Sequence, residues 1–214
     1  MKENLSQMKK RAEKIIEIFY DTYGNAECSL DFTSPLELLI ATQLAAQCTD
    51  ARVNLVTPAL FKKYPDAYAF AFADETELQE MIRSCGFYKN KARNIIACCR
   101  KLISDFGGVV PDNMDDLLSL PGVGRKTANL VLGDIFGIPG IVVDTHATRL
   151  SNRFGLTKNK DPYKIELDLM KIIPKEHWSW FCHCLVEHGR AYCKAQKPDC
   201  PNCPIGEFCP TYLP

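Results

Sequence analysis

Lys126 is the residue of this 214-residue chain whose type and position most directly suggest chemistry. It follows a glycine-rich turn and stands at the start of a segment, 127–136, whose apolar residues recur at helical spacing. A cation in the first turn of a helix opposes the helix dipole, and Arg125 adds a second positive charge, so the uncharged amine is favoured. An uncharged lysine amine is a nucleophile. The alternative is a solvated lysine that binds phosphate as a point charge, and this stretch alone leaves both interpretations open.

The turn before Lys126 has the composition of a phosphate-binding loop. Gly122 and Gly124 are expected to adopt positive φ and to leave backbone N–H groups uncovered by any side chain. These N–H groups stand at the start of a helix, where unpaired donors and the dipole favour an anion such as a nucleic-acid phosphate. The alternative is a hairpin of two helices that needs glycine only to reverse the chain. The two cations that follow, Arg125 and Lys126, favour the phosphate-binding interpretation.

A second candidate for chemistry is Asp144, which follows the apolar run 141–143 and is expected to cap a helix. Hydrogen bonds from backbone N–H groups keep such a carboxylate ionised. Next to a reacting sugar it could stabilise positive charge or accept a proton. On the pattern alone, a purely structural cap is the favoured interpretation. His146, two residues later, is more typical of a packed or phosphate-contacting histidine than of a catalytic one.

Four cysteines near the end of the chain have the spacing of a metal site. They are Cys193, Cys200, Cys203 and Cys209, in the pattern C-x6-C-x2-C-x5-C, with prolines among them that stiffen the loop. Four thiolates suit either zinc or an iron–sulfur cluster. Structural zinc usually pairs two short C-x2-4-C knuckles, and this loop has only one, so the spacing favours a [4Fe–4S] cluster. The remaining cysteines lie mostly in helical patterns and are interpreted as small core residues.

Helices are expected to position all of these residues. Apolar spacing, with Asp50 and Asp112 among the expected caps, predicts helices over 1–23, 34–47, 50–63, 74–85, 89–106, 112–118, 127–136, 144–155, from 161 onward and from 174 to 188. The one strand-like run, 141–143, is too short to found a sheet. The expected fold is therefore all-α.

The composition is that of an ordinary globular protein, with 46% hydrophobic and 24% charged residues. No apolar run of about 18 residues or more is present, so no membrane association is expected. The N-terminal segment lacks the apolar stretch of a signal peptide, and eleven cysteines then indicate a reducing, cytoplasmic location.

Charge is balanced overall, at a formal net charge of +0, but it is distributed unevenly. Residues 66–80 hold five acids and no cation, whereas residues 81–104 hold six cations and no acid. These cations are Arg83, Lys89, Lys91, Arg93, Arg100 and Lys101. A solvated helix face is the simpler interpretation. Its place just before the glycine-rich turn favours a surface that follows a phosphate backbone.

Three motifs together resemble the endonuclease III family of helix-hairpin-helix DNA glycosylases. They are the turn 120–128, the step 143–146 and the cysteine loop, in this order and spacing, and the resemblance extends from Phe32 to Cys209. It implies a bilobal all-α fold. One lobe is a six-helix barrel over residues 25–136, with the helix-hairpin-helix at about 112–136. The other lobe joins residues 1–24 to 137–214 and carries the [4Fe–4S] loop, 193–209.

The resemblance also implies roles for single residues. Lys126 is the amine nucleophile and Asp144 the catalytic carboxylate. Gln47 fills the gap left by an everted nucleotide, and Phe87 occupies the wedge position, where the family often has Leu. DNA contacts are further expected at Gly122, Gly124, Arg125, His146, Arg190 and Lys194. This chain departs from the family at Ala45, where Ser is frequent, and at Cys184, where a second histidine is common.

These implications predict a base-excision repair enzyme that removes oxidised pyrimidines from duplex DNA and cleaves the resulting abasic site by β-elimination. The expected partner is double-stranded DNA with damaged bases or abasic sites. The expected protein is a cytoplasmic, nucleoid-associated monomer. A monofunctional mispair glycosylase and a non-catalytic DNA-binding iron–sulfur module are the alternatives. The presence of both Lys126 and Asp144 argues against them.

Overall fold

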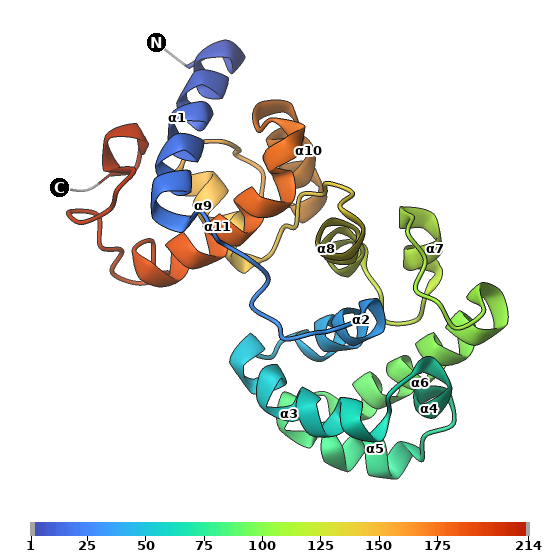
Figure 1. Cartoon of the computed structure of the whole chain (residues 1–214). Coiled ribbons are helices and arrows are strands. Elements are labelled where there is room, and N and C mark those ends of the chain that lie inside the picture. The colour runs from blue at the N-terminus through green and yellow to red at the C-terminus, as the bar shows by residue number, and fades with distance from the viewer. Residues whose placement is uncertain (1–2, 213–214) are drawn as a thin grey trace. The chain divides into compact units, whose positions relative to one another are not determined.

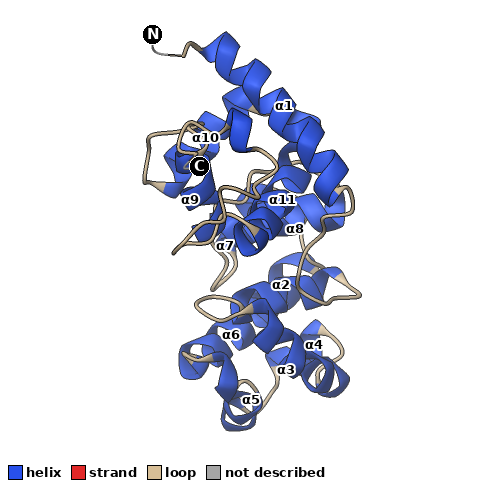
Figure 2. Cartoon of the chain, turned by 90° about the vertical axis from the view of Figure 1, so that its left-hand side faces the viewer, coloured by secondary structure: helices blue, strands red, loops and turns tan. Residues whose placement is uncertain are grey.

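A computed structural model describes residues 3–212, and these residues form helices, turns and loops with no strand among them (Figures 1 and 2). The helices in chain order are α1 (Leu5–Tyr23), α2 (Pro35–Leu44), α3 (Asp50–Lys63), α4 (Ala67–Ala71), α5 (Glu75–Met81), η1 (Arg83–Cys85), α6 (Tyr88–Phe106), α7 (Met114–Ser119), α8 (Arg125–Phe136), α9 (Thr145–Arg153), α10 (Pro162–Ile172), η2 (Lys175–His177), α11 (Trp178–Ala191) and η3 (Gly206–Phe208). The all-α prediction is confirmed. No helix in the described part of the chain is long and apolar enough to span a membrane.

The chain divides into two compact units. The central unit is Cys28–Ile138, and the terminal unit combines the residues up to Glu27 with those from Pro139 onward. The boundaries expected from the sequence, 24/25 and 136/137, fall three and two residues earlier. The barrel arrangement of the central helices stays a prediction. Each unit is described below by itself.

Helix α2 is the core of the central unit. Its residues from Leu38 to Leu44 are all buried, as expected of a helix surrounded by others rather than lying on a surface. It packs against α3, α6 and α8, while α6 also packs against α4 and α5. Ser34 caps α2 by accepting a hydrogen bond from Glu37 N, and Pro35 occupies the first helical position. The core therefore fixes where α2 ends and where α8 lies against it.

The terminal unit is assembled on α1. Ala12, Ile15, Ile16 and Phe19 recur at i, i+3, i+4 and i+7 and are buried, so one face of α1 packs inward against α10 and α11. The Phe19 ring lies 5.8 Å, centroid to centroid, from the ring of Phe181 on α11. Burying such a side chain contributes about 1.5–3 kcal/mol. This packing supports α9 and the cysteine loop, which carry the candidate site residues of this unit.

Several helix ends differ from the expected ones. Helix α2 ends at Leu44, and the chain turns before the expected end at Gln47. Thr49, not Asp50, caps α3, and Asn113, not Asp112, caps α7. In both places two neighbouring residues can cap, and the residue with extended backbone geometry is the one that does so. The five-residue helix α4 was not expected, because it is too short to show a helical period.

Candidate functional site

Lys126 is the second residue of α8, in the first turn as the sequence predicts, and its side chain is exposed. The N-cap residue is Gly124, which has no side chain, so no side-chain acceptor closes the helix start. Because position 124 provides no capping side chain, an external acceptor such as a phosphate can take the place of the cap. Ala128, Val131 and Leu132 are buried and hold the helix against α2. A rigid helix therefore presents a lysine amine and open backbone donors at one end.

The turn before α8 requires glycine at position 122 for two reasons. Gly122 has φ +77°, in the left-handed region, as expected. A Cβ there would lie 2.6 Å from Gln43 Oε1 and 3.0 Å from Asn94 Cβ, so the turn packs directly on α2 and α6. The same expectation is wrong for Gly124, which has φ −103° and ψ 175° and has open space where a Cβ would stand. Gly124 is the N-cap residue of α8, and because it has no side chain it leaves the start of the helix without a side-chain cap.

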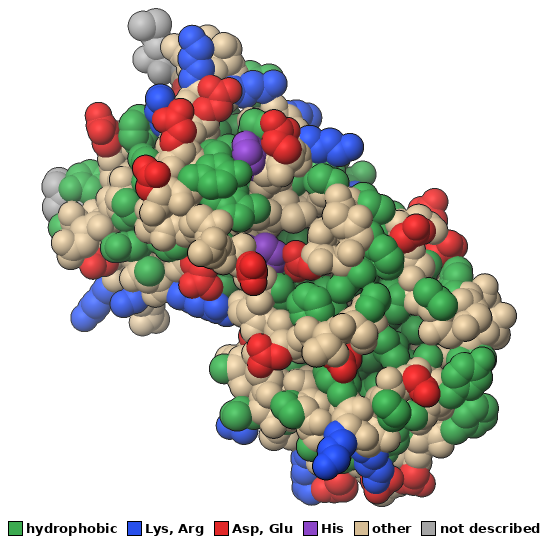
Figure 3. Space-filling model, viewed as in Figure 1, with side chains coloured by type: hydrophobic (Ala, Val, Ile, Leu, Met, Phe, Trp, Pro, Cys, Tyr) green, Lys and Arg blue, Asp and Glu red, His purple; other side chains and the backbone are tan. Residues whose placement is uncertain are grey.

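Most cations of residues 81–104 lie beside acids or backbone acceptors of their own unit. Several are paired with acids: Arg83 with Glu80 at 3.2 Å, Arg93 with Glu75 at 3.9 Å, and Lys101 with Asp105. Arg100 donates to the carbonyl of Ala71 at 2.9 Å, and Lys91 is buried. Figure 3 shows lysine and arginine side chains beside acidic ones at the lower end of the central unit. Acids of the same unit therefore partly balance the charge of this stretch, and a surface that follows a phosphate backbone stays a prediction.

Lys91 is a positioning residue that the sequence argument missed. Its Nζ donates to Leu44 O at 2.7 Å and to Cys85 O at 2.9 Å, and burial lowers its pKa. It thereby ties the end of α2, just before Gln47, to the segment just before Phe87. A signal was present, because position 91 falls on the buried face of α6, with positions 92, 95, 96, 98, 99 and 102.

Gln47 and Phe87, the expected filler and wedge, share an unusual backbone. Their φ values are 54° and 48°, in the left-handed region that non-glycine residues seldom adopt. Both side chains are exposed, Phe87 to 62%. Backbone strain of this kind costs about 1–3 kcal/mol and clusters at functional sites. The central unit thus holds two exposed side chains in costly conformations on neighbouring loops.

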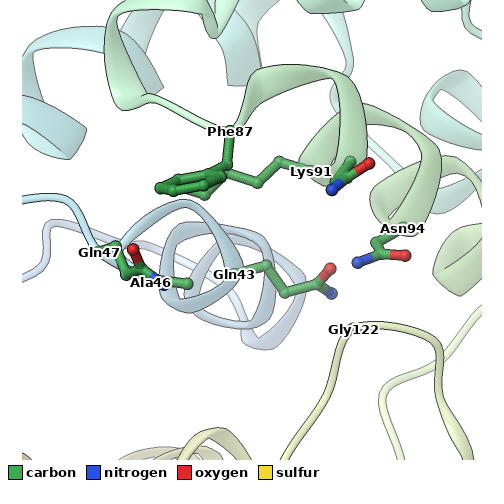
Figure 4. A pocket seen from close by; sticks show the side chains of 8 residues that line it. Gln43, Ala46, Gln47, Phe87, Lys91, Asn94 and Gly122 are labelled. Atoms are coloured by element: carbon green, nitrogen blue, oxygen red, sulfur yellow. The ribbon is translucent and has the colours of Figure 1, made fainter.

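A pocket of about 170 Å³ lies beside these two residues, and all of its lining comes from the central unit. The lining residues are Gln43, Ala46, Gln47, Phe87, Asn90, Lys91, Asn94 and Gly122. Figure 4 shows the side-chain amides of Gln43 and Asn94 pointing toward one another above the loop that carries Gly122. The pocket therefore joins the glycine turn to the filler and wedge positions.

In the terminal unit, Asp144 is the N-cap of α9, as predicted. Its carboxylate accepts a hydrogen bond from Ala147 N at 2.7 Å, and its side chain is partly exposed. One oxygen is engaged in the cap, and a carboxylate keeps further acceptor positions for a substrate. Lys126 belongs to the central unit and Asp144 to the terminal unit, so each is placed within its own unit only.

His146 has the environment of a packed histidine. Its Nδ1 lies 3.2 Å from Arg149 Nη2, and a Cβ on Gly189 of α11 would lie 2.4 Å from the same Nδ1. Glycine at 189 is what allows α9 and α11 to approach here. Arg190, expected at DNA, forms an ion pair with Glu187 at 3.1 Å, and Lys194 is exposed on the cysteine loop.

Two arginines of α9 hold the start of the cysteine loop. Arg149 donates to Cys193 O from Nε at 3.2 Å and from Nη2 at 3.1 Å. Arg153 donates to Lys194 O at 2.7 Å and to Ala195 O at 3.0 Å, and its Nη1 lies 3.2 Å from Cys193 Sγ. Sequence reasoning missed both arginines, since their spacing of four residues on an ordinary helix carries no motif. Arg153 thus places a positive charge at the Cys193 sulfur, where it would stabilise a thiolate, and Arg149 holds the adjacent carbonyl oxygen.

The four cysteine sulfurs are neighbours. Burial, together with the nearby sulfurs of Cys209, Cys193 and Cys200, raises the pKa of Cys203 to about 11. Among the described residues, no three His, Cys, Asp or Glu side chains converge as they would around one metal ion. The donor set of this loop is four cysteine thiols. The chemistry of these residues fits an iron–sulfur cluster.

His188 lies directly beneath this loop and was also missed. It is fully buried, with Nε2 at 3.4 Å from Cys203 Sγ and Nδ1 at 3.1 Å from the hydroxyl of Tyr23. Burial lowers the pKa of His188 to about 4. A neutral ring therefore links the cysteine loop to α1.

Comparison with known proteins agrees with these features. A model of the HhH-GPD superfamily, described as base excision DNA repair proteins, matches residues 40–175. Endonuclease III of Synechocystis sp. is 53% identical over 97% of this chain and 95% of its own length. Endonuclease III of Bacillus subtilis is 46% identical over 94% of this chain and 92% of its own.

Solved structures agree as well. A structure of a non-covalent Endonuclease III–DNA complex superimposes with a TM-score of 0.91 at 46% identity, covering 95% of both chains. A trapped covalent Endonuclease III–DNA intermediate gives the same TM-score, covering 95% of this chain and 96% of that one. The family predicted from the three motifs is confirmed: this chain belongs to the HhH-GPD superfamily of base excision DNA repair proteins and, within it, to the endonuclease III family.

Proposed function

We propose that this chain is a bifunctional base-excision repair enzyme, a DNA glycosylase and abasic-site lyase that removes oxidised pyrimidines from duplex DNA. The observation that carries the proposal is Lys126, an exposed amine on the uncapped start of α8. The open N–H groups beside it attract a phosphate and hold the strand next to the amine. We also propose that it acts as a monomer in the cytoplasm, on nucleoid DNA.

Lys126 Nζ is the nucleophile of the reaction. Its lone pair attacks C1′ of the damaged deoxyribose, the C1′–N glycosidic bond breaks, and the base leaves with the bonding electrons and takes up a proton. The ring opens to give a Schiff base between Nζ and C1′. Loss of a proton from C2′ then expels the 3′ phosphate and breaks the strand. Water hydrolyses the imine and returns the free lysine.

Asp144 supports this chemistry as an ionised carboxylate. Its hydrogen bond to Ala147 N, at 2.7 Å, holds it in one orientation. There it stabilises the positive charge that develops on the sugar as the base departs, or moves the protons that the steps require. These roles need an oriented negative charge, and the N-cap position of α9 provides one.

Duplex binding is assigned to the glycine turn and the exposed loop residues. Gly122 and Gly124 leave backbone N–H groups accessible beside Arg125, and phosphate contacts of this kind are independent of sequence. Phe87 enters the base stack as a wedge and Gln47 fills the space of the everted nucleotide, which offsets part of the unstacking cost of a few kcal/mol. His146, Arg190 and Lys194 are assigned to the backbone of the same duplex.

A [4Fe–4S] cluster is proposed for the loop 193–209, held by Cys193, Cys200, Cys203 and Cys209. Support comes from the four grouped thiols, the single short knuckle and the arginine donor at Cys193 Sγ. When bound, the cluster supplies a rigid centre around which the loop folds. In that role it fixes the loop that carries Lys194, and Arg149 and Arg153 orient the loop from α9.

The test is a set of duplexes that each carry one defined lesion. Purified protein is incubated with duplexes containing thymine glycol, 5-hydroxycytosine, an adenine·guanine mispair or no lesion. Base release and strand scission are then measured separately. The proposal predicts release of the oxidised pyrimidines, scission on the 3′ side and no action on the mispair. Base release without scission would instead identify a monofunctional glycosylase, and binding without either would identify a non-catalytic module. Elemental analysis should find about four irons per chain; stoichiometric zinc without iron would refute the cluster.

A further inference from the structure

Two cysteine thiols meet in the central unit, beside the loops that carry Gln47 and Phe87. Cys48 directly follows Gln47, and Cys85 lies two residues before Phe87. The two cysteines are distant in the sequence, yet the Cys48 thiol lies beside the Cys85 thiol, and both are free. This pair is separate from the four cysteines of the loop 193–209, which belong to the terminal unit. It therefore has no part in the proposed iron–sulfur site.

Backbone hydrogen bonds hold the two thiols in place. Lys91 Nζ donates to Leu44 O at 2.7 Å and to Cys85 O at 2.9 Å, so one buried ammonium ties together the two segments that carry the cysteines. The backbone N–H of each cysteine also donates to the carbonyl three residues earlier, at 3.1 Å for Cys48 and 2.9 Å for Cys85. The contact between the thiols is therefore fixed by the fold of this unit.

The two thiols differ in exposure and in protonation. Cys85 is 1% exposed, and burial, together with the neighbouring Cys48 sulfur, raises its pKa to about 11. Cys48 is partly exposed, and the contact of its sulfur with Thr49 O, at 3.7 Å, lies at the surface. The Lys91 ammonium lies near both sulfurs, and a nearby cation stabilises a thiolate. An accessible sulfur beside a cation, with a second thiol within reach, is the arrangement of a peroxide-sensitive pair.

We propose that Cys48 and Cys85 are a modification site, at which hydrogen peroxide forms a reversible disulfide between the loops that carry Gln47 and Phe87. The Cys48 thiolate attacks one peroxide oxygen, the O–O bond breaks, and the departing hydroxide takes up a proton and becomes water. The sulfenic acid left on Cys48 is then attacked by the Cys85 sulfur. The S–S bond forms, the S–O bond breaks, and the Cys85 proton leaves with the hydroxide as a second water. Two thiols are oxidised and one peroxide is reduced, and a dithiol reductant reverses the bond.

The bond should weaken the recognition of damaged DNA, a consequence that rests on the function proposed above. A disulfide holds its sulfurs about 2.05 Å apart, much closer than two unbonded sulfurs, so it draws the two loops together. Gln47 and Phe87 already have positive φ, and few alternative conformations can absorb this shift. The filler and the wedge then meet the duplex in altered positions. We expect the oxidised protein to bind an abasic-analogue duplex about fivefold more weakly than the reduced protein.

The test uses the holoprotein, treated with hydrogen peroxide at the highest dose that leaves its iron content unchanged. Remaining thiols are blocked with N-ethylmaleimide, and tryptic peptides are analysed by mass spectrometry without reduction. Trypsin releases Cys48 on the peptide 15–52 and Cys85 on the peptide 84–89, so the disulfide joins these two peptides. The proposal predicts the linked peptides after peroxide and their separation by dithiothreitol. Absence of the linked peptides at this dose would overturn it.

Single variants assign the bond, because the peptide 15–52 also contains Cys28. Cys48→Ser and Cys85→Ala should each abolish the linked peptides, whereas Cys28→Ser should form them like the wild type. Linked peptides that persist in Cys48→Ser would overturn the assignment.

DNA binding is measured with the same samples, by fluorescence anisotropy on a duplex with one tetrahydrofuran abasic analogue. Peroxide should raise the Kd of the wild-type protein about fivefold, dithiothreitol should restore it, and Cys48→Ser should show no change. Equal Kd values for the oxidised and reduced wild-type protein would refute the effect on DNA binding. The proposed function fails separately, if the reduced wild-type protein binds the abasic analogue no better than an undamaged duplex while the disulfide still forms.

Discussion

Helices α8 and α9 differ in how their N-termini are capped. Each helix begins with backbone N–H groups that have no partner within the helix. Helix α9 closes its start with Asp144, whose carboxylate accepts from Ala147 N at 2.7 Å. Helix α8 begins at Gly124, which leaves its start open, and places Lys126 in the first turn. The start of α9 thus carries a negative charge whose carboxylate is hydrogen-bonded within the helix. The start of α8 carries the positive end of the helix dipole and no side-chain cap, so it can bind an anion.

The rest of the chain shows that the open start is unusual. Side chains of Asn, Ser, Thr or Asp cap α1, α2, α3, α4, α5, α7 and α10 as well as α9. Only α6, α8 and α11 of the described α-helices lack such a cap. At a glycine N-cap such as Gly124, the omitted side-chain cap forgoes a few tenths of a kcal/mol of stability, and at other residues it forgoes about 1 kcal/mol. Helix α8 therefore lacks a capping side chain at the place where a phosphate is proposed to bind.

The largest effect, on turnover, is expected from removing the charge of Asp144 while keeping the N-cap of α9. Asp144→Asn should lower the turnover of an oxidised-pyrimidine duplex by about 100-fold or more, because the catalytic carboxylate is lost. Asn caps a helix about as well as Asp, so the melting temperature should stay within about 1 °C. Single-turnover kinetics and thermal unfolding measure the two quantities. Unchanged turnover would show that Asp144 only caps.

The next effect concerns the turn that precedes α8. Gly122→Ala should lower the free energy of unfolding by about 2 kcal/mol, since it places a Cβ at positive φ and against Gln43. Urea denaturation of the variant and of the wild-type protein measures this loss of unfolding free energy. Gly107→Ala, also at positive φ but with open space around the Cβ, separates strain from the clash and should cost less. Equal costs at both positions would mean that contact with Gln43 contributes nothing.

Adding an N-cap side chain to α8 should change helix stability and DNA affinity in opposite directions. Gly124→Asp should cap α8 and raise its stability by a few tenths of a kcal/mol, because φ is ordinary and space is open. The same carboxylate should weaken duplex binding by about tenfold through repulsion of the phosphate. Gly124→Ala adds neither a cap nor a charge and serves as the control. If Gly124→Asp bound DNA as tightly as Gly124→Ala, the phosphate would have to bind elsewhere.

The smallest effect separates capping from charge at α9. Asp144→Ala should be about 1 kcal/mol less stable than Asp144→Asn, because it leaves the N–H of Ala147 without its acceptor. Both variants should be equally inactive, since each lacks the carboxylate. Chemical denaturation of the two proteins under one buffer condition gives the difference. Equal stabilities would mean that water replaces the cap at no cost.

Much of the fold could be predicted from the sequence because caps and apolar spacing are local signals. Ser34 and Asp161 cap the expected helices, and Lys126 and Asp144 lie at helix starts as expected. The wrong predictions concerned contacts between residues that are far apart in the sequence. Lys91 looked like a surface cation, but it is buried, and its ammonium donates to the carbonyl of Cys85 and to that of Leu44, which is far away in the sequence. The partners of a buried charge cannot be found from its neighbours in the chain.

The candidate site shows the same limit. The role of Gly122 as a turn glycine could be predicted, but its contact with Gln43 could not, because the two are 79 positions apart in the sequence. Gly124 was expected to adopt positive φ because glycine permits it, whereas the backbone is extended there. Arg149 and Arg153 carry no motif and became visible only through their contacts with the cysteine loop.

The most direct test of the account is covalent trapping at Lys126. Borohydride is added while the protein acts on a duplex with one abasic site, and the protein–DNA adduct is mapped by peptide mass spectrometry. The account predicts a reduced adduct on Lys126, no adduct with Lys126→Gln, and a Kd of that variant within about threefold of wild type, because one of several phosphate-side contacts is lost. A Lys126→Gln protein that is trapped and cleaves DNA at the wild-type rate would contradict the account and place the nucleophile elsewhere.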